Sequence, residues 1–229
     1  MTIRFQTQLD KLKRRMLTVG AMVEERVRMA LRAVEERDAE LALKVIESDK
    51  EIDHNEVEVE EECLKILALY QPVAVDLRFL TAVIKINNDL ERIGDEAVNI
   101  AERVVFFAKQ PPVPVPVDYS EMGEKTQAML KSSLDSLVNM DVDLAYKICL
   151  KDDEVDDMNR DIFEKITESI KSQPDRTDYL IHLLSVSRHL ERIADHATNI
   201  AEEVIYLIEG EISRHLFKKE GDPDATSDS

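Results

Sequence analysis

LERIGDEAVNIAE occupies residues 90–102 of this chain, and LERIADHATNIAE occupies residues 190–202. The two stretches begin 100 residues apart and are identical at ten of thirteen positions. A match of this length between two parts of one chain indicates an internal duplication, in which each copy forms the same structural unit.

The duplication extends upstream with small gaps. The Gln-Pro pair at 71–72 matches the pair at 173–174, and DKEID at 49–53 matches DDEVD at 152–156. Each copy therefore has the same order: an acidic segment, a long helix, a Gln-Pro break, and a second long helix that carries the LERI motif.

The residue pattern of the repeated units predicts helices. The chain has only five glycines, and its seven prolines fall almost entirely in three short places. Long stretches without either residue favour helix over sheet. Apolar or small residues within 86–107 are spaced 4, 3, 4, 3, 4, 3, and those within 186–207 follow the same spacing. A period near 3.5 is typical of helices that pack as in a coiled coil.

These patterns predict an all-α fold of two tandem three-helix bundles. The expected helices run from about Phe5 to Glu36, from a cap at Asp38 to Tyr70, from Pro72 to Ala108, from Tyr119 to Asn139, from a cap at Asp141 to Ser172, and from Pro174 to Gly210. Short loops between them imply antiparallel neighbours. We expect bundles at 1–110 and 119–210, a proline-rich linker at 111–118, and a polar, disordered tail at 211–229.

The charge and the distribution of apolar residues make some classes of function improbable. Thirty basic and 48 acidic residues give a net charge of −18, which disfavours nucleic-acid binding. This charge suits cations or a basic partner surface, and it also serves solubility alone. No stretch approaches the ~20 apolar residues of a membrane span, and the N-terminus lacks an apolar signal core. We therefore expect a cytoplasmic protein without membrane insertion.

Acidic side chains follow the apolar seam of the first copy. Glu91, Asp95 and Asn99 are spaced i, i+4, i+8, so they share one face of a helix. The preceding helix carries Asp49 and Asp53, also one turn apart. If these helices pack antiparallel, a rise of about 1.5 Å per residue places both pairs at one height.

The second copy repeats this arrangement with Glu191, Asp195 and Asn199 on one helix and Asp152 and Asp156 on the other. Four carboxylates and an amide oxygen form a hard, oxygen-rich site of the kind that binds metal ions. A second interpretation is structural ion pairing, because Arg92 and Arg192 directly follow the two glutamates.

The stretch QPVAVDLRFLTAVIKINNDLERIGDEAVNIAE (71–102), its second copy and the six-helix order resemble the PhoU family of bacterial phosphate-transport accessory proteins. The resemblance covers residues 5–210. It implies a cytoplasmic homodimer that binds iron, zinc, manganese or magnesium, in multinuclear clusters, through E/D-xxx-D motifs. It also implies a regulator that restrains the phosphate ABC transporter, with the transporter ATPase and a sensor histidine kinase as partners.

Transferred onto this chain, the motifs give as metal ligands Asp49, Asp53, Glu91, Asp95, Asp152, Asp156, Glu191 and Asp195, with Asn99 and Asn199 added on geometry. The resulting hypothesis is a regulator without enzymatic activity.

Two other hypotheses stay open. One is a metal-free acidic scaffold that binds protein partners through its helical faces. The other is a ferritin-like di-iron enzyme, which needs Glu-x-x-His on two helices. This chain has one such match at 51–54, and its counterpart in the second copy ends in Asp157. The sequence contains no Gly-rich phosphate loop and no helix N-terminus that predicts direct phosphate binding.

Overall fold

The computed structural model describes residues 3–111 and 117–210. Its helices are α1 (Ile3–Glu36), α2 (Ala39–Glu47), α3 (Asp49–Tyr70), α4 (Val75–Ala108), α5 (Ser120–Asn139), α6 (Val142–Cys149), α7 (Asp152–Ser172) and α8 (Thr177–Glu209), with a short 3-10 helix at Pro174–Arg176. The predicted all-α class is confirmed, and the described part of the chain contains no strand. Most of the expected linker and all of the expected tail lie outside the described residues.

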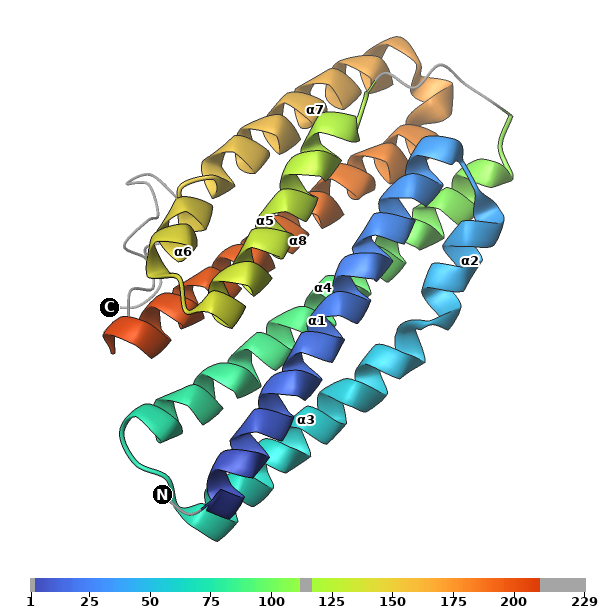
Figure 1. Cartoon of the computed structure of the whole chain (residues 1–229). Helices are drawn as coiled ribbons and strands as arrows, with labels where there is room; N and C mark the ends of the chain where they lie inside the picture. Colours follow the sequence, from blue (N-terminus) through green and yellow to red (C-terminus); the bar gives the residue numbers. More distant parts are fainter. Residues whose placement is uncertain (1–2, 112–116, 211–229) are drawn as a thin grey trace, which may run out of the picture.

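The two halves lie side by side along their length (Figure 1). α4 and α8 pack against each other and run antiparallel, and α1 and α5 also meet between the halves. The α2–α3 arm packs on α1 and α4, and the α6–α7 arm packs on α5 and α8. In this arrangement α4 and α8 are each covered by helices of their own half and by one helix of the other half.

The apolar seam lies at the centre of this packing. The predicted seam residues of both repeated helices are buried, and Leu90, Ile93, Leu190 and Ile193 have no exposed surface. They belong to one continuous buried cluster that extends through both halves. Burial of each large aliphatic side chain contributes ~1.5–3 kcal/mol, so this shared core is the main source of stability.

The middle helix of each half is broken, whereas the sequence predicts it to be continuous. In the first half, Ser48 separates the end of α2 at Glu47 from the start of α3 at Asp49. The carbonyl oxygen of Ser48 accepts the backbone N–H of Glu51 at 3.2 Å, a tighter i+3 bond, and it also accepts an N–H of the buried Arg26. In the second half the same break occurs at Leu150 and Lys151. The i+3 bonds interrupt the regular helical ladder at both places.

The Gln-Pro breaks also differ from the prediction. α4 begins at Val75 rather than Pro72, because Gln71 (φ 46°) adopts the left-handed helical conformation and Ala74 (φ 50°, ψ −117°) is also non-helical. A residue before proline is disfavoured in the right-handed helical region, so α3 stops at this point. In the second half, α8 begins at Thr177 after the short 3-10 helix.

The two predicted N-caps are confirmed. The Asp38 carboxylate accepts the Leu41 N–H at 3.0 Å, and the Asp141 carboxylate accepts the Leu144 N–H at 3.0 Å. A cap of this kind contributes ~1 kcal/mol by satisfying a backbone donor that the helix leaves open.

Complementary acid–base pairs cross the contact between α4 and α8. The His196 ring lies 2.9 Å from the Asp89 carboxylate, and the His189 ring lies 2.6 Å from the Glu96 carboxylate. Arg192 forms a second ion pair with Glu96 at 2.9 Å. The duplication relates position 89 to 189 and position 96 to 196, so the first half supplies both acids and the second half supplies both histidines.

Glu96 is held in its charged form. Burial acts to raise the pKa of Glu96, which is 3% exposed, but the His189 hydrogen bond and the Arg192 and His189 charges together lower it. An ionised carboxylate at this depth is stable only while its partners remain. The interface therefore favours contact between unlike halves.

We predict that His189→Asp with His196→Glu, which gives the second half the residues of the first, will destabilise the protein by ~3 kcal/mol or more. Four carboxylates would then face one another across α4 and α8. Urea denaturation measures the loss. The matched control adds Asp89→His and Glu96→His, which restores both pairs with their directions exchanged. Equal stability of the double variant and the original chain would contradict the prediction.

Candidate metal centres

Two clusters of carboxylates form where the arms meet the repeated helices. In the first half, α3 carries Asp49 and Asp53, and α4 carries Glu91 and Asp95. Burial raises the pKa of Asp49, Glu91 and Asp95, and the charge of Asp53 raises each of these pKa values further. The structure therefore brings all four predicted residues within electrostatic reach of one another.

Arg26 of α1 belongs to this first cluster, and the sequence analysis did not identify it. Its side chain is 4% exposed, and its Nη1 lies 3.2 Å from Asp49 Oδ1. A sequence signal for it exists: residues 12, 16, 19, 23, 30 and 33 continue an apolar 4-3 spacing along α1, and Arg26 occupies the seam position that completes it. A charged residue in an apolar seam needs a buried counter-charge.

The second cluster lies between α7 and α8. Asp152, Asp156 and Asp195 each offer a carboxylate oxygen, and these three oxygens all lie within 4.8 Å of one another. The Thr198 hydroxyl donates to Asp152 at 3.2 Å. Burial, and then the charges of Asp195 and Asp156, raise the pKa of Asp152 to about 7. Burial and the charges of Asp156 and Asp152 likewise raise the pKa of Glu191, against the opposing charges of Arg188 and Arg192, which places this fourth residue at the same site.

The residues of this cluster fit a metal ion. Carboxylate oxygens are the preferred ligands of Mg²⁺ and Mn²⁺, and they also bind iron and zinc. Three carboxylates at this separation repel one another when ionised, and a cation between them offsets that repulsion. The ligand role of all these residues stays a prediction.

The two asparagines point elsewhere. The amide of Asn199 donates to Asp89 of the other half at 3.3 Å, and the amide of Asn99 donates to Glu96 at 3.5 Å. Both contacts join the polar network between α4 and α8. Within the described part of the chain these hydrogen bonds lead to Glu96 and Asp89, which lie outside the two clusters, and the ligand roles of both asparagines also stay predictions.

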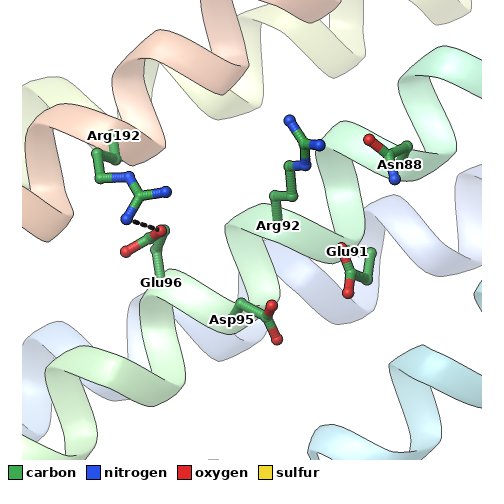
Figure 2. A pocket seen from close by; sticks show the side chains of 6 residues that line it. All are labelled: Asn88, Glu91, Arg92, Asp95, Glu96 and Arg192. Atoms are coloured by element: carbon green, nitrogen blue, oxygen red, sulfur yellow. Dashed lines mark ion pairs between the residues drawn. The ribbon is translucent and has the colours of Figure 1, made fainter.

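An open groove of about 570 Å³ adjoins the first cluster (Figure 2). It is lined by Asn88, Glu91, Arg92, Asp95, Glu96 and Arg192. Arg192 pairs across the halves with Glu96, and the Arg92 charge is the weakest of the influences on the pKa of Glu91. The sequence suggested that Arg192 pairs with a glutamate of the carboxylate clusters. Arg192 does form an ion pair, but its partner is Glu96 of the other half.

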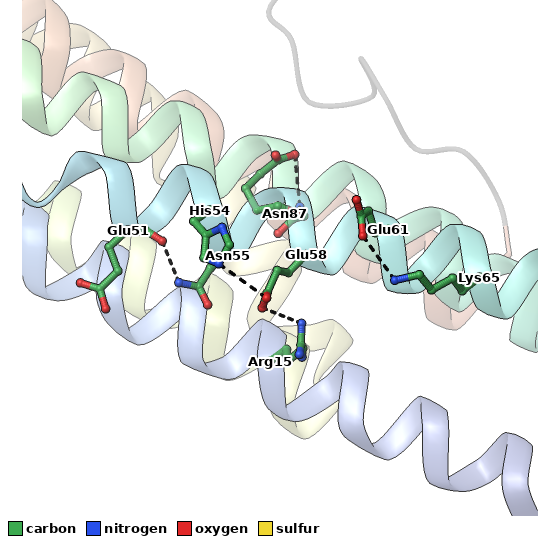
Figure 3. Close-up of polar contacts among 9 residues, drawn as sticks. Arg15, Glu51, His54, Asn55, Glu58, Glu61, Lys65 and Asn87 are labelled. Atoms are coloured by element: carbon green, nitrogen blue, oxygen red, sulfur yellow. Dashed lines mark hydrogen bonds and ion pairs between the residues drawn. The ribbon is translucent and has the colours of Figure 1, made fainter.

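The single Glu-x-x-His match lies on the outer face of α3. His54 has 74% of its side chain exposed and lies 3.6 Å from Glu58, and Glu51 is also exposed (Figure 3). Ferritin-like di-iron sites project these residues into a bundle core. The structure therefore does not support the ferritin-like hypothesis.

No helix in the described ranges is both long and apolar enough to cross a membrane. The two cysteines, Cys63 and Cys149, are buried and do not form a disulfide.

Comparison with known proteins finds two matches to the PhoU domain family, at residues 16–104 and 119–204. A phosphate-specific transport system accessory protein PhoU homolog of Aquifex aeolicus is 40% identical, with 93% of this chain and 96% of that protein covered. The crystal structure of PhoU from Pseudomonas aeruginosa is similar with a TM-score of 0.88 at 35% identity, over 90% of this chain and 100% of that one. The crystal structure of the phosphate transport system regulatory protein PhoU from Streptococcus pneumoniae is also similar, with a TM-score of 0.80 at 30% identity. The match covers 91% of this chain and 98% of that one.

We predict that Asp152→Asn will stabilise the metal-free protein at pH 8 more than at pH 4. The folded-state pKa of about 7 lies above the 3.8 of an unperturbed aspartate, so folding favours the protonated acid. Stability from this group is present at low pH and is lost as the pH rises from about 4 to 7. Thermal unfolding in the presence of a chelator measures the difference. A gain of the same size at both pH values would contradict the assigned burial of this carboxylate.

Proposed function

Because this chain belongs to the PhoU family, we propose that it regulates phosphate uptake and phosphate-starvation signalling without being an enzyme. It acts as an accessory protein of a phosphate transport system, as the printed names of its relatives describe. In the finer form of the proposal it restrains the phosphate ABC transporter through contact with the ATPase. It also links that transporter to a sensor histidine kinase, and it works as a cytoplasmic homodimer.

Metal binding at the two carboxylate clusters is part of this proposal. The main observation that supports metal binding is that Asp152, Asp156 and Asp195 each offer a carboxylate oxygen within 4.8 Å of the other two. The Thr198 hydroxyl donates a hydrogen bond to Asp152 Oδ1. Asp152 and Asp156 are half-buried, and like charges at such a depth are more costly than those of an acidic surface patch unless a cation accompanies them.

In this proposal, the acidic face formed by the second cluster on α7 and α8 is a surface that contacts a partner. α7 and α8 pack against each other and against the shared core, and this packing fixes the backbone positions from which the carboxylates of the second cluster project. A bound metal ion supplies positive charge and coordination positions to this acidic face. A chain of net charge −18 would then present less repulsive patches to a partner of the transport system.

We predict that Glu91→Ala, Asp95→Ala, Glu191→Ala and Asp195→Ala together will abolish metal binding while leaving helical content intact. Purification without a metal-affinity tag followed by elemental analysis by mass spectrometry measures the bound metal, and circular dichroism measures the helices. Several equivalents of iron, zinc or manganese in the original chain support the two-site proposal. If the original chain stays metal-free after incubation with these ions, the metal-binding proposal is wrong. The metal-free acidic scaffold that binds protein partners is then the favoured hypothesis.

The regulatory role has a separate test. In a bacterium that lacks its own family member, this chain is expected to lower phosphate uptake under phosphate-rich conditions, measured with radiolabelled phosphate. Expression of the folded quadruple variant as the matched control shows whether the acidic clusters take part. Uptake that is the same with and without the chain would contradict the regulatory proposal.

A further inference from the structure

One end of the first half exposes a group of aliphatic side chains. Leu69, at the end of α3, is 76% exposed, and Val73, in the turn between α3 and α4, is 75% exposed. Val75 and Leu77 at the start of α4 and Ile3 at the start of α1 are exposed as well. Large aliphatic side chains that are exposed together are typical of a surface that contacts another molecule.

The N-terminal part of α1 adds basic side chains at the same end. α1 spans 34 residues, whereas its counterpart α5 spans 20. Because Gly20 corresponds to Gly123 in the duplication, the additional residues of α1 are 3–16. This extension holds one acid, Asp10, and five basic residues: Arg4, Lys11, Lys13, Arg14 and Arg15.

Much of this basic charge is free to attract a ligand. Arg15 is paired with Glu58 at 2.8 Å (Figure 3), whereas Lys11 and Arg14 are exposed and form no ion pair within the described ranges.

The basic extension and the aliphatic turn form one surface. The rings of Phe5 and Tyr70 lie 5.2 Å apart, and the Lys13 ammonium lies 5.2 Å from the centre of the Phe79 ring. The start of α1 and the α3–α4 turn lie together at one end of the molecule (Figure 1). Residues 3–16 and 65–79 together are named the basic tip.

The second half shows that the fold does not require these aliphatic residues. After the Gln-Pro pair, the first half has Val-Ala-Val at 73–75 and the second half has Asp-Arg-Thr at 175–177. Leu69 corresponds to Lys171 in the same alignment. The α7–α8 turn lies at the opposite end of the molecule (Figure 1). The same connection between helices therefore forms with polar residues, and the aliphatic side chains of the basic tip call for a different explanation.

Charge separates the basic tip from the remainder of the chain. The tip has seven basic residues and two acidic ones, whereas the remainder has 23 basic and 46 acidic residues. A negatively charged surface attracts the tip and repels the remainder, so it meets the molecule at this end. Anionic lipid headgroups attract basic patches, and neighbouring aliphatic side chains bury apolar area at the boundary between headgroups and acyl chains. A projecting turn of this kind fits a flat lipid surface.

We propose that the basic tip docks the protein on an anionic lipid bilayer. Val73, Val75 and Leu69 contact the headgroup region, and Lys11 and Arg14 lie beside the lipid phosphates. The contact is peripheral and spans no part of the bilayer. Glu91 lies 16 residues along α4 from Val75, about 24 Å at 1.5 Å per residue, so the first carboxylate cluster stays clear of the lipid. This docking goes beyond the proposed function and needs neither a metal ion nor a transporter.

The test is flotation of the purified full chain with lipid vesicles. Vesicles of phosphatidylglycerol and phosphatidylcholine in equal parts are expected to bind the chain about tenfold or more tightly than vesicles of phosphatidylcholine alone. Higher salt is expected to weaken this binding, because the Debye length falls from about 10 Å at 0.1 M to about 3 Å at 1 M.

Lys11→Glu with Arg14→Glu is expected to lower the affinity for the anionic vesicles by about tenfold or more. Lys171→Glu with Arg176→Glu is the matched control. It makes the same change of charge at exposed positions next to the α7–α8 turn, at the opposite end of the molecule, and is expected to leave binding unchanged.

Val73→Thr with Val75→Thr tests the aliphatic contribution, because it keeps shape and charge and adds two hydroxyl groups. It is expected to weaken binding to the anionic vesicles by about threefold or more. Circular dichroism shows whether each variant is folded.

A fluorophore that responds to polarity locates the contact. It is attached at Val73→Cys or, as the matched control, at Asp175→Cys, the corresponding position of the second half. The native Cys63 and Cys149 are buried, which disfavours their labelling. On anionic vesicles the emission is expected to shift to the blue for the label at position 73 and to stay unchanged for the label at position 175.

Equal binding to both kinds of vesicle, or binding to neither, would overturn the proposal. Anionic binding that the tip variants leave unchanged would also overturn it. If the original chain binds no vesicles and the folded tip variants lose control of phosphate uptake, the tip contacts a protein and the lipid proposal is wrong. Vesicle binding by a chain that does not alter phosphate uptake supports the docking proposal and contradicts the regulatory one, so the two failures are distinguishable.

Discussion

The antiparallel contact between α4 and α8 joins the halves and places every other element. Each of these helices buries an apolar seam, and each carries acidic groups on both edges of that seam. The Asp89–His196 and Glu96–His189 pairs close the contact with charges that complement each other only between unlike halves. A duplicated chain faces the problem that identical surfaces bring like charges together, and divergence at these positions removes that conflict.

Because of the helical period, the residues of the LERI motif face three different environments. Leu90 and Ile93 enter the core, Glu91 and Asp95 face the α3 side, and Glu96 crosses to α8. A rotation of α4 by a fraction of a turn would move a carboxylate into the core or a leucine into solvent. Both changes cost several kcal/mol, so the core holds the acidic side chains in a defined place.

The carboxylates of the two halves have different electrostatic surroundings. The first half carries its own cation in Arg26, which also stabilises the break between α2 and α3. The second half has Met129 at the equivalent position, and there the pKa of Asp152 rises to about 7. The two carboxylate clusters of this duplicated architecture therefore have different neighbours: Arg26 and Ser48 in the first half, and Thr198 in the second.

The sequence by itself determined the duplication, the helical class, the buried seam and the two aspartate caps, because these follow from local periodicity and backbone hydrogen bonding. It also predicted which acids approach one another, since the Gln-Pro turn and the helical rise set their height. Only the tertiary structure decided the breaks at Ser48 and Leu150, the place of Arg26, and the partners of Asn199 and Glu96. Those features depend on the rotation and register of helices that are distant in sequence, and residue spacing along one helix does not specify either quantity.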